Sequence, residues 1–397
     1  MTNMVQLDDV MDFIRGITFK PDQLVDVSRE DAVVCMRTKN VQRDLDESDL
    51  IAIPKSIMRD EKKYLKPGDV LVSSANSWEL VGKCSYVGDL DYLATAGGFI
   101  SIVRPKKGKT HPRFLYHWLT NPATQHAIRH LGRQTTNISN LDVKRFKKLD
   151  IPDFDFHEQQ TIAEILDKAD GIRRKREAAL RISDDLLGSA FLEMFGDPVR
   201  NPHGYWQQTL GEVASFISGG TPSKKRADYW EGNFPWVSPK DMKVDLIYDA
   251  EDHVSEVVFS ETSLKRIPAN TPLIVVRGMI LAHTVPIALT QREVAINQDM
   301  KAVKFNSEID PMFGFWSLKV LHNRILSQVD TAAHGTKRLD TSRLQALPIL
   351  VPGDNLQSEF VAITQKFGAM RARLSASLNE ASQMFDALSQ RAFRGEL

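Results

Sequence analysis

Apolar residues recur at alternating spacings of three and four positions in two long segments of this chain. In the later segment the repeated positions are Phe360, Ile363, Phe367, Met370, Leu374, Ala381, Met384 and Leu388, with Ser377 as the one weak position. In the earlier segment they are Ile162, Ile165, Ala169, Ile172, Ala179 and Leu186, interrupted by Arg176 and Ser183. This spacing is that of a coiled-coil seam. We predict two long helices that pair within the chain, and the alternative is that each helix covers only its own domain.

The rest of the chain alternates short apolar runs with turns, which predicts strands, and each half also contains one shorter predicted helix. In the first half we expect strands at residues 32–36, 69–73 and 99–103 and a helix over 111–130. In the second half we expect strands at 271–276 and 301–305 and a helix over 311–329. The two halves therefore share one order of elements.

Sequence repeats support this correspondence between the halves. Residues 7–18 (LDDVMDFIRGIT) align with residues 210–221 (LGEVASFISGGT), and Leu, Val, Phe, Ile, Gly and Thr match at one constant offset. Residues 141–149 (LDVKRFKKL) resemble residues 339–347 (LDTSRLQAL) at nearly the same offset. A proline-marked break and a long helical segment follow each match. The repeated unit is therefore one globular domain plus one helix, used twice.

Composition and charge change this picture little. The chain has 51 basic and 51 acidic residues, and this balance argues mildly against a nucleic-acid partner. Basic residues nevertheless cluster at 104–113, 144–148, 173–176 and 224–226, and we interpret 173–176 as the solvated face of a helix. The two distant cysteines exclude a disulfide framework and suit a reducing cytoplasm. No secretory signal or membrane span is predicted, so we expect a cytoplasmic protein with no membrane partner.

Two segments resemble a known family. Residues 210–242 (LGEVASFISGGTPSKKRADYWEGNFPWVSPKDM) resemble the opening of a target-recognition domain from the specificity subunits of type I restriction–modification systems, chiefly in GGTPS and PWVS. Residues 157–204 resemble that family's central spacer in EQQ at 158–160, ILDKAD at 165–170 and FGDP at 195–198. With the repeat, the likeness covers essentially the whole chain. The first domain departs from the pattern, because GITF at 16–19 stands where the second has GGTP.

The resemblance implies an α+β fold. Two target-recognition domains of mixed α/β structure would be related by the internal repeat and separated by two long antiparallel coiled-coil spacer helices. On this basis we place the first domain at residues 1–152, the central spacer helix at 153–200, the second domain at 201–352 and the C-terminal spacer helix at 353–397.

The resemblance also implies a non-catalytic subunit of a larger enzyme. Each domain would contact one half of a split, asymmetric target in double-stranded DNA. The helices would position two adenine methyltransferase subunits, and ATP-driven translocase–nuclease subunits would join them for restriction. S-adenosylmethionine, ATP and Mg²⁺ would then be bound by the partner subunits, and this chain would need no cofactor of its own.

Catalytic motifs are absent from the sequence, as this interpretation requires. It has no GxxxxGK(S/T) phosphate loop and no HExxH metal motif, and we predict no metal ligands. The segment Asn201-Pro202-His203-Gly204 resembles an amino-methyltransferase motif only superficially, because it lacks the second proline and its adjoining aromatic residue. Gly97-Gly98 and Gly219-Gly220 are better interpreted as turn formers than as cofactor loops.

Candidate DNA-binding residues lie at equivalent places in the two halves. Loop side chains that bond phosphates or base edges are the ones expected at such a surface. One pair of loops comprises Arg133, Gln134, Thr135, Thr136 and Asn137 in the first half and His334, Gly335, Thr336, Lys337 and Arg338 in the second. A second pair comprises Ser74 and Asn76 with Arg277, and a third comprises Arg37, Lys39 and Asn40 with Ser238 and Lys240. Thr221, Ser223 and Lys224 are further candidates for phosphate contacts. An ordinary polar surface is the alternative for any one loop alone.

Two other functions are compatible with parts of this pattern. One is a coiled-coil scaffold or adaptor of a related defence system that reads no DNA. The other is a self-contained restriction or modification enzyme whose motifs have diverged. The target sequence cannot be predicted, because base readout depends on the docked position of loops and on DNA deformability.

Overall fold

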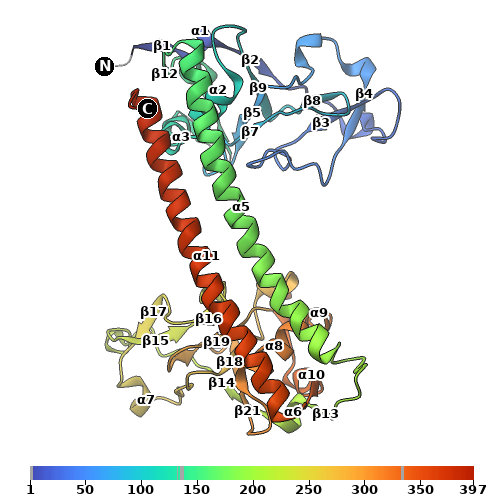
Figure 1. Ribbon diagram of the computed structural model, residues 1–397, viewed down its shortest axis with the longest axis vertical. Coiled ribbons are helices and arrows are strands. Elements are labelled where there is room, and N and C mark those ends of the chain that lie inside the picture. The colour runs from blue at the N-terminus through green and yellow to red at the C-terminus, as the bar shows by residue number, and fades with distance from the viewer. Residues whose placement is uncertain (1–2, 132, 135–137, 332–334) are drawn as a thin grey trace. The chain divides into compact units, whose positions relative to one another are not determined.

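The computed structural model of the protein describes residues 3–131, 133–134, 138–331 and 335–397. The chain folds into two compact units (Figure 1). Unit 1 comprises Met1–Glu177 together with Ala376–Leu397, and unit 2 comprises Ala178–Ser375. Two long helices, α5 (Phe156–Phe195) and α11 (Asp354–Arg394), each contribute to both units. The division of the sequence into four segments with bounds at 152, 200 and 352 stays a prediction.

Unit 1 is built around two sheets. The larger is antiparallel, in the order β2 (Met11–Arg15), β9 (Ile100–Pro105), β5 (Val70–Ser73) and β7 (Cys84–Tyr86). The other has the order β4 (Ala52–Pro54), β3 (Ala32–Met36) and β8 (Ala94–Ala96), with β3 and β8 parallel. Every residue of β5 is buried, because its sequence VLVS lies between packed layers. The three strands predicted in this half are confirmed.

Short strands and helices complete unit 1. Strand β1 (Met4–Gln6) pairs with β12 (Asp150–Pro152), and a small sheet has the order β10 (Arg133–Gln134), β11 (Ser139–Asn140) and β6 (Ala75–Asn76). The helices are α1 (Leu7–Val10), α2 (Pro112–Thr120), α3 (Pro122–His130) and α4 (Val143–Lys147), with 3-10 turns η1 (Pro21–Gln23), η2 (Lys55–Ile57) and η3 (Glu61–Lys63). Apolar side chains of α2 and of the larger sheet share one buried core.

Unit 2 repeats this plan. Its larger sheet has the order β14 (Ala214–Ser218), β21 (Met300–Phe305), β18 (Pro272–Val275), β19 (Ile287–Thr290) and β16 (Leu246–Ile247). The other sheet has the order β17 (Asp252–Val254), β15 (Phe234–Val237) and β20 (Ala295–Ile296). Two strand pairs are β13 (Gln207–Thr209) with β24 (Pro348–Leu350), and β22 (Asp330–Thr331) with β23 (Lys337–Arg338). The helices are α6 (Leu210–Val213), α7 (Val258–Glu261), α8 (Pro311–Val320), α9 (His322–Leu326) and α10 (Thr341–Gln345), with 3-10 turns η4 (Ala227–Tyr229), η5 (Pro239–Asp241) and η6 (Met279–Ala282).

Equivalent hydrogen bonds confirm the internal repeat. The amide of Leu7 donates to the carbonyl oxygen of Leu149 at 2.8 Å, and the amide of Leu210 donates to that of Leu347 at 2.8 Å. These four leucines are the ends of the segments that match in sequence. The repeat therefore extends from residue pattern to backbone pairing.

A second equivalence lies at the start of each long helix. The buried side chain of Gln159 accepts a bond from the amide of His111 and donates to the carbonyl oxygens of Lys109 and Phe154. In unit 2 the buried side chain of Gln357 accepts from the amide of Asp310 and donates to the carbonyl oxygens of Glu308 and Pro352. Each glutamine thus ties the first turns of a long helix to the loop that enters α2 or α8.

The shorter helix predicted in each half is broken in two, so the prediction of single helices over 111–130 and 311–329 was wrong. In unit 1 the break falls at Asn121, whose side chain accepts a hydrogen bond from the amide of Ala123 and caps α3. Pro122 cannot donate an amide hydrogen to the preceding turn, so the helix ends and starts again. In unit 2, α8 ends at Val320 and α9 begins at His322.

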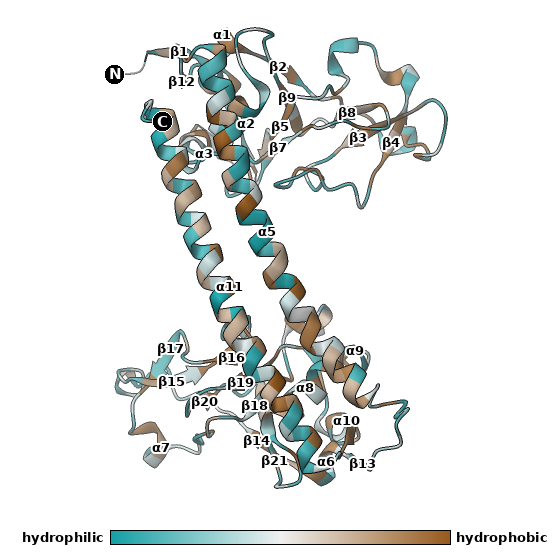
Figure 2. Cartoon of the chain, in the orientation of Figure 1, coloured by the Kyte–Doolittle hydropathy of each residue, from teal (hydrophilic) through white to brown (hydrophobic). Residues whose placement is uncertain are grey.

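The two long helices are confirmed, but their seam differs in detail from the prediction. Polar and apolar residues alternate along both (Figure 2). Four predicted seam residues are exposed: Ile172, Leu186, Met370 and Met384. Two polar residues that interrupt the predicted apolar seam contact each other in unit 1: Nη1 of Arg176 donates to the carbonyl oxygen of Ser377 at 2.5 Å.

Each helix also packs on more than its own domain. The last turns of α11 place Ala392 and Phe393 against the core of unit 1, which otherwise consists of residues before 170. The last turns of α5 place Phe191 and Phe195 in the core of unit 2. The alternative in which each helix covers only its own domain was therefore wrong.

Candidate nucleic-acid interface

One tight turn in each unit joins the segments that carry most of the candidate DNA-binding residues. We call these the 97–100 turn and the 297–300 turn. The amide of Ile100 donates to the carbonyl oxygen of Gly97 at 2.8 Å, and the amide of Met300 donates to that of Asn297 at 3.1 Å. Each turn directly precedes a central strand of its sheet, β9 or β21, so the sheet fixes its position. The interpretation of Gly97-Gly98 as turn formers is confirmed.

In unit 1, two candidate segments hydrogen-bond to this turn. The amide of Gly97 donates to the carbonyl oxygen of Met36, the residue before Arg37, at 2.9 Å. The amide of Ser74 donates to the carbonyl oxygen of Phe99 at 2.9 Å. Strand β6 continues from Ser74 and pairs with β11, which pairs with β10. Loops that are far apart in sequence therefore meet at one end of the sheet.

Unit 2 reproduces the arrangement bond for bond. The amide of Asn297 donates to the carbonyl oxygen of Val237 at 2.9 Å, and the amide of Val276 donates to that of Asp299 at 2.8 Å. The backbones of Arg277 and Arg338 then pair in an isolated antiparallel β-bridge, as the backbones of Ala75 and Asn140 pair in unit 1. The predicted equivalence of these loops therefore extends to their backbone contacts.

Side chains beside the 297–300 turn are cationic and polar. Arg277 and Arg338 are exposed and form ion pairs with Asp299 (3.9 Å) and Asp340, and contact with DNA would require them to exchange these partners. Nζ of Lys337 donates to Oγ1 of Thr331 at 2.8 Å. Gly335 has a φ of 78°, which allows the chain to turn before Thr336. Both guanidinium groups are exposed at this end of the unit, and contacts with phosphates or bases require such exposure.

The segment after the Gly219-Gly220 pair also reaches the 297–300 turn. The hydroxyl of Thr221 bonds to the side chain of Gln298, and Nδ2 of Asn297 donates to the same hydroxyl at 3.4 Å. Ser223 and Lys224 follow it on an exposed loop. The structure thus brings Thr221 to the 297–300 turn.

The first unit presents smaller polar groups. Oγ of Ser74 donates to the carbonyl oxygen of Phe99 at 3.1 Å, and Nδ2 of Asn76 donates to Oγ of Ser73 at 3.1 Å. Thr135, Thr136, Asn137 and His334 lie outside the described residues, and for Arg133 and Gln134 only the backbone strand is described. Their assignment to DNA contact stays a prediction.

In the third pair of candidate loops, the candidate side chains form hydrogen bonds and ion pairs with other residues of the protein. Asn40 is fully buried, and its side chain accepts from the amide of Arg37 and donates to the carbonyl oxygens of Asp46 and Asp49. Arg37 and Lys39 both form ion pairs with Asp49. In unit 2, Ser238 caps η5 through Asp241, and Lys240 pairs with Glu251 and Asp252. These groups shape loops beside the turns, and contact with DNA would require them to exchange partners.

Three residues at the turns were not among the sequence candidates: Phe99, Gln298 and Asp299. The Gly97-Gly98 pair was recognised as a turn, but its equivalence to Asn297-Gln298 was not. Aligning the strands at 100–105 and 300–305 and carrying the alignment back to the residues before them would have matched the two turns.

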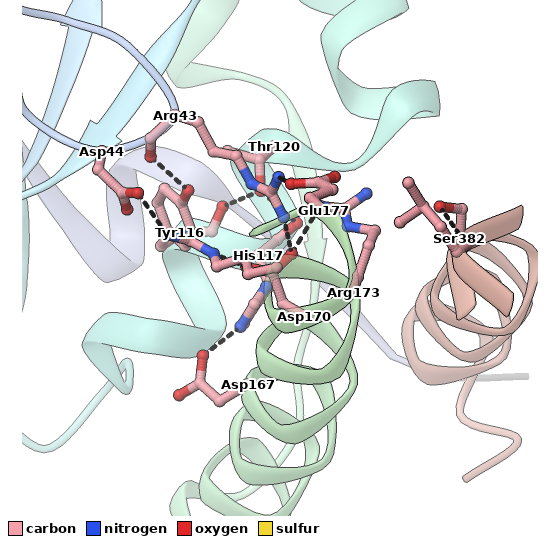
Figure 3. Close-up of polar contacts among 12 residues, drawn as sticks. Arg43, Asp44, Tyr116, His117, Thr120, Asp167, Asp170, Arg173, Glu177 and Ser382 are labelled. Atoms are coloured by element: carbon pink, nitrogen blue, oxygen red, sulfur yellow. Dashed lines mark hydrogen bonds and ion pairs between the residues drawn. The ribbon is translucent and has the colours of Figure 1, made fainter. Parts of the chain in front are cut away.

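A charged cluster joins the first domain to α5 within unit 1 (Figure 3). Asp170, which is largely buried, accepts bonds from Arg43, Arg173 and Arg174, each at 2.6 Å. Burial raises the pKa of the Asp170 carboxyl, but the bonds from Arg174 and Arg43 outweigh it and hold that pKa at about 2. The interpretation of 173–176 as a solvated helix face was therefore wrong, because α5 uses Arg173 and Arg174 to bind the loop that contains Arg43.

One helical turn earlier, Asp167 forms a second ion-paired site. It pairs with Arg113, and Nε2 of the buried His117 lies 2.7 Å from Oδ1 of Asp167. Burial raises the pKa of Asp167, but the bonds from His117 and Arg113 outweigh it and hold that pKa at about 2. Both carboxylates therefore fasten the first domain to the helix.

Among the described residues, these features include no catalytic constellation. Within the part of the chain that the structure describes, no group of three or more His, Cys, Asp or Glu residues could hold a metal ion. Burial raises the pKa of the Cys35 and Cys84 thiols to about 12, so neither is a nucleophile at neutral pH. Asn201 forms a turn in which its side chain bonds to the backbone of Tyr205. Among the described helices, none has a stretch long and apolar enough to cross a membrane.

The fold and this surface define a class: a duplicated α+β chain whose two domains present equivalent polar loops. The family model described as type I restriction modification DNA specificity domain matches twice, at residues 2–181 and 202–381. The chain therefore belongs to the family of type I restriction–modification specificity subunits. As a specificity subunit it is non-catalytic, and it is one component of a larger system.

Individual relatives agree with this assignment. The specificity subunit of a type I restriction enzyme from Escherichia coli is 30% identical over 320 residues, covering 77% of this chain and 73% of that protein. The crystal structure of a type I restriction–modification S subunit from M. genitalium superposes with a TM-score of 0.55 and 18% identity, covering 99% of this chain and 96% of that one. A chain from a structural study of type I system assembly gives a TM-score of 0.57 at 18% identity, covering 100% and 98%. The last two likenesses concern the fold.

Proposed function

We propose that this chain reads a bipartite, asymmetric target in double-stranded DNA, with one half-site for each domain. The observation that carries the proposal is the equivalent gathering of polar loops at the 97–100 and 297–300 turns. The two surfaces differ in side chains, Ser74 and Asn76 against Arg277 and Arg338, so the two half-sites differ in sequence. Membership of a DNA specificity family supports this function over a scaffold that reads no DNA.

The proposal extends to partners and cofactors. The chain positions two methyltransferase subunits and ATP-dependent translocase–nuclease subunits on the DNA. S-adenosylmethionine, ATP and Mg²⁺ are bound by those subunits, and this chain holds none of them. The assembly works in the cytoplasm, where its DNA substrate is found.

The test is selection of a random DNA library by the chain assembled with its methyltransferase subunits. We expect enrichment of two short motifs separated by a fixed gap. Lys337→Ala and Arg338→Ala each affect only the half-site read by unit 2. Loss of a base contact costs about 1–3 kcal/mol at one position, whereas loss of a phosphate contact weakens all sequences about equally.

Lys265→Ala is the matched control, because Lys265 is an exposed lysine of the same unit. It should leave both motifs and the affinity unchanged. An assembly that enriches no motif would support the scaffold instead. Methyl transfer from labelled S-adenosylmethionine by the chain alone would indicate a self-contained enzyme.

A further inference from the structure

We infer that Phe99, at the tip of the 97–100 turn, is a specificity-determining residue that reads the first half-site by apolar contact with a base. This inference rests on the proposed function. It assigns a role to a side chain that hydrogen-bond chemistry alone does not single out.

The side chain of Phe99 is presented outwards by a fixed backbone. It is 63% exposed, although both neighbouring residues in the chain belong to a tightly bonded turn. The carbonyl oxygen of Phe99 accepts from the amides of Ser74 and Ala75 at 2.9 and 3.3 Å, and from the hydroxyl of Ser74. The backbone is therefore held at the same point from which the ring projects. The turn therefore loses little backbone freedom when the ring binds.

The two glycines before Phe99 lie in close packing, and the equivalent turn of unit 2 makes the same backbone bonds with Asn297 and Gln298 in their places. A side chain at Gly97 would begin 3.2 Å from the carbonyl oxygen of Met36, and one at Gly98 would begin 3.4 Å from Oγ1 of Thr18. Beside the ring lies a hollow of about 360 Å³, lined by Ile17, Phe19, Arg37 and Thr38 among others. The tip thus combines an apolar ring with the ion-paired Arg37, and it adjoins the polar groups of Ser74 and Asn76.

Comparison of the repeats separates this ring from ordinary surface variation. Asp299 occupies the equivalent position, because its carbonyl oxygen accepts from the amides of Val276 and Arg277 as that of Phe99 does from Ser74 and Ala75. The same rigid position therefore carries an apolar ring in one domain and a carboxylate beside Arg277 in the other. Such a difference is expected where two copies of one scaffold read different bases.

DNA offers two apolar partners for such a ring. One is the 5-methyl group of thymine, which lies in the major groove. The other is the face of a base exposed when a side chain wedges between neighbouring base pairs. Both are apolar contacts that make binding depend on sequence at one position.

The experiment compares the wild-type assembly with Phe99→Ala and Phe99→Leu in half-site-resolved DNA selection. We expect Phe99→Ala to reduce discrimination at one base pair of the first half-site about five- to tenfold and to leave the second half-site unchanged. Phe99→Leu, which remains apolar, should retain part of it. Trp206→Ala is the matched control, because Trp206 is an aromatic residue that is 70% exposed and belongs to unit 2.

Modified DNA distinguishes the two apolar contacts. Replacing thymine by deoxyuridine removes only the methyl group and should abolish the difference between wild type and Phe99→Ala if the methyl is read. A rise in 2-aminopurine fluorescence that is absent with Phe99→Ala indicates a wedge. Either result supports the inference.

Other outcomes overturn it. They are an unchanged first half-site, an equal loss of affinity for every sequence, or a loss of assembly with methyltransferase subunits in the absence of DNA. In these cases the wild-type assembly still enriches two motifs. If it enriches none, the proposed function itself fails.

Discussion

Asp170 shows how a single carboxylate can organise a domain boundary. It lies on α5, is 7% exposed, and neutralises charge from Arg43 of the first domain as well as from its neighbours Arg173 and Arg174. Arg43 also pairs with Glu177 at 2.7 Å. Removing one member of a buried ionic group leaves the others without compensation, which costs more than the pair itself contributes.

Asp170→Ala should therefore lower the free energy of unfolding of unit 1 by about 2–3 kcal/mol, somewhat less than for fully buried pairs because the arginines stay partly exposed. Urea unfolding and hydrogen exchange of the loop at residues 37–49 provide the measurement. Arg29→Ala, which breaks the exposed Arg29–Asp31 pair, is the control and should cost less than about 1 kcal/mol. Equal effects of the two substitutions would show that Asp170 has no organising role.

The same prediction has a pH dependence. The pKa of Asp170 in the folded protein is about 2, below the ordinary value of 3.8. Its contribution to stability is therefore complete above about pH 4 and is lost as the pH falls towards 2. Asp170→Ala should remove this part of the acid dependence, so the two proteins should become more similar in stability at low pH.

For single residues, the sequence identified polar and charged side chains but not the hydrogen bonds and ion pairs that they form within the protein. It identified Asn40 as a candidate for DNA contact, yet the loop around Asn40 uses all of its side-chain bonding groups. It assigned Arg173 to solvent, yet Arg173 lies over the ring of Phe385 at 4.5 Å and pairs with Asp170. The partners of Asn40 lie only three to nine residues away, but residue types alone do not show how the loop closes on them. Phe385 is distant from Arg173 in the sequence, and local pattern contains no information about that contact.

Gln159 and Gln357 provide the corresponding test at the scale of elements. Each holds the first turns of a long helix on its domain by three hydrogen bonds to backbone groups. Gln159→Ala and Gln357→Ala should each destabilise their own unit by about 1–3 kcal/mol, because buried backbone groups lose their partners. Hydrogen exchange at His111 and at Asp310 reports the two sites separately.

Gln160→Ala is the internal control, since Gln160 is exposed and bonds only to Glu164 among the contacts described. It should change stability by less than about 0.5 kcal/mol. A result in which only one of the two buried glutamines matters would mean that the repeats are not held in the same way.

The elements themselves could be predicted well, and their interruptions less well. Strand β3 begins and ends where its apolar run does, at Ala32 and Met36. The break at Asn121 was missed even though Asn-Pro is a local capping signal, because the helix was extended to His130 from apolar residues that all precede the break. Met370 and Met384 fit the spacing of three and four but are exposed. Periodicity alone does not show which side a domain will cover.

At the scale of the whole molecule, each unit contains the start of one long helix and the end of the other. In unit 1 the ring of Phe393 packs on that of Phe114 with 5.6 Å between ring centroids, and in unit 2 the ring of Phe195 packs on that of Phe313 with 5.0 Å between ring centroids. Two copies of residues 1–200 could therefore make the contact of unit 1 twice, with Phe195 of each copy on Phe114 of the other in the place of Phe393.

We expect this half-chain to form a concentration-dependent dimer that, with methyltransferase subunits, selects a palindromic target. The bond from the side chain of Arg176 to the carbonyl oxygen of residue 377 needs only a backbone acceptor and can be reproduced. The bond between Asn121 and Ser389 and the contact of Arg173 with Phe385 cannot, so the dimer should be weak. Ultracentrifugation and DNA selection measure the two properties. Enrichment of the original asymmetric motif by a folded dimer would show that the halves are not equivalent.

Each unit is built from one domain and parts of both long helices, so the fold does not require one particular order of the domains along the chain. In unit 2, residues 196–206 connect the end of α5 to β13. In unit 1 the equivalent places are the end of α11 and the start of β1 (Figure 1). Joining them with a linker of similar length and opening the chain between α5 and β13 would keep every strand pair and both helix packings. Such a circular permutant would begin with the second recognition surface and would be expected to read the same two half-sites.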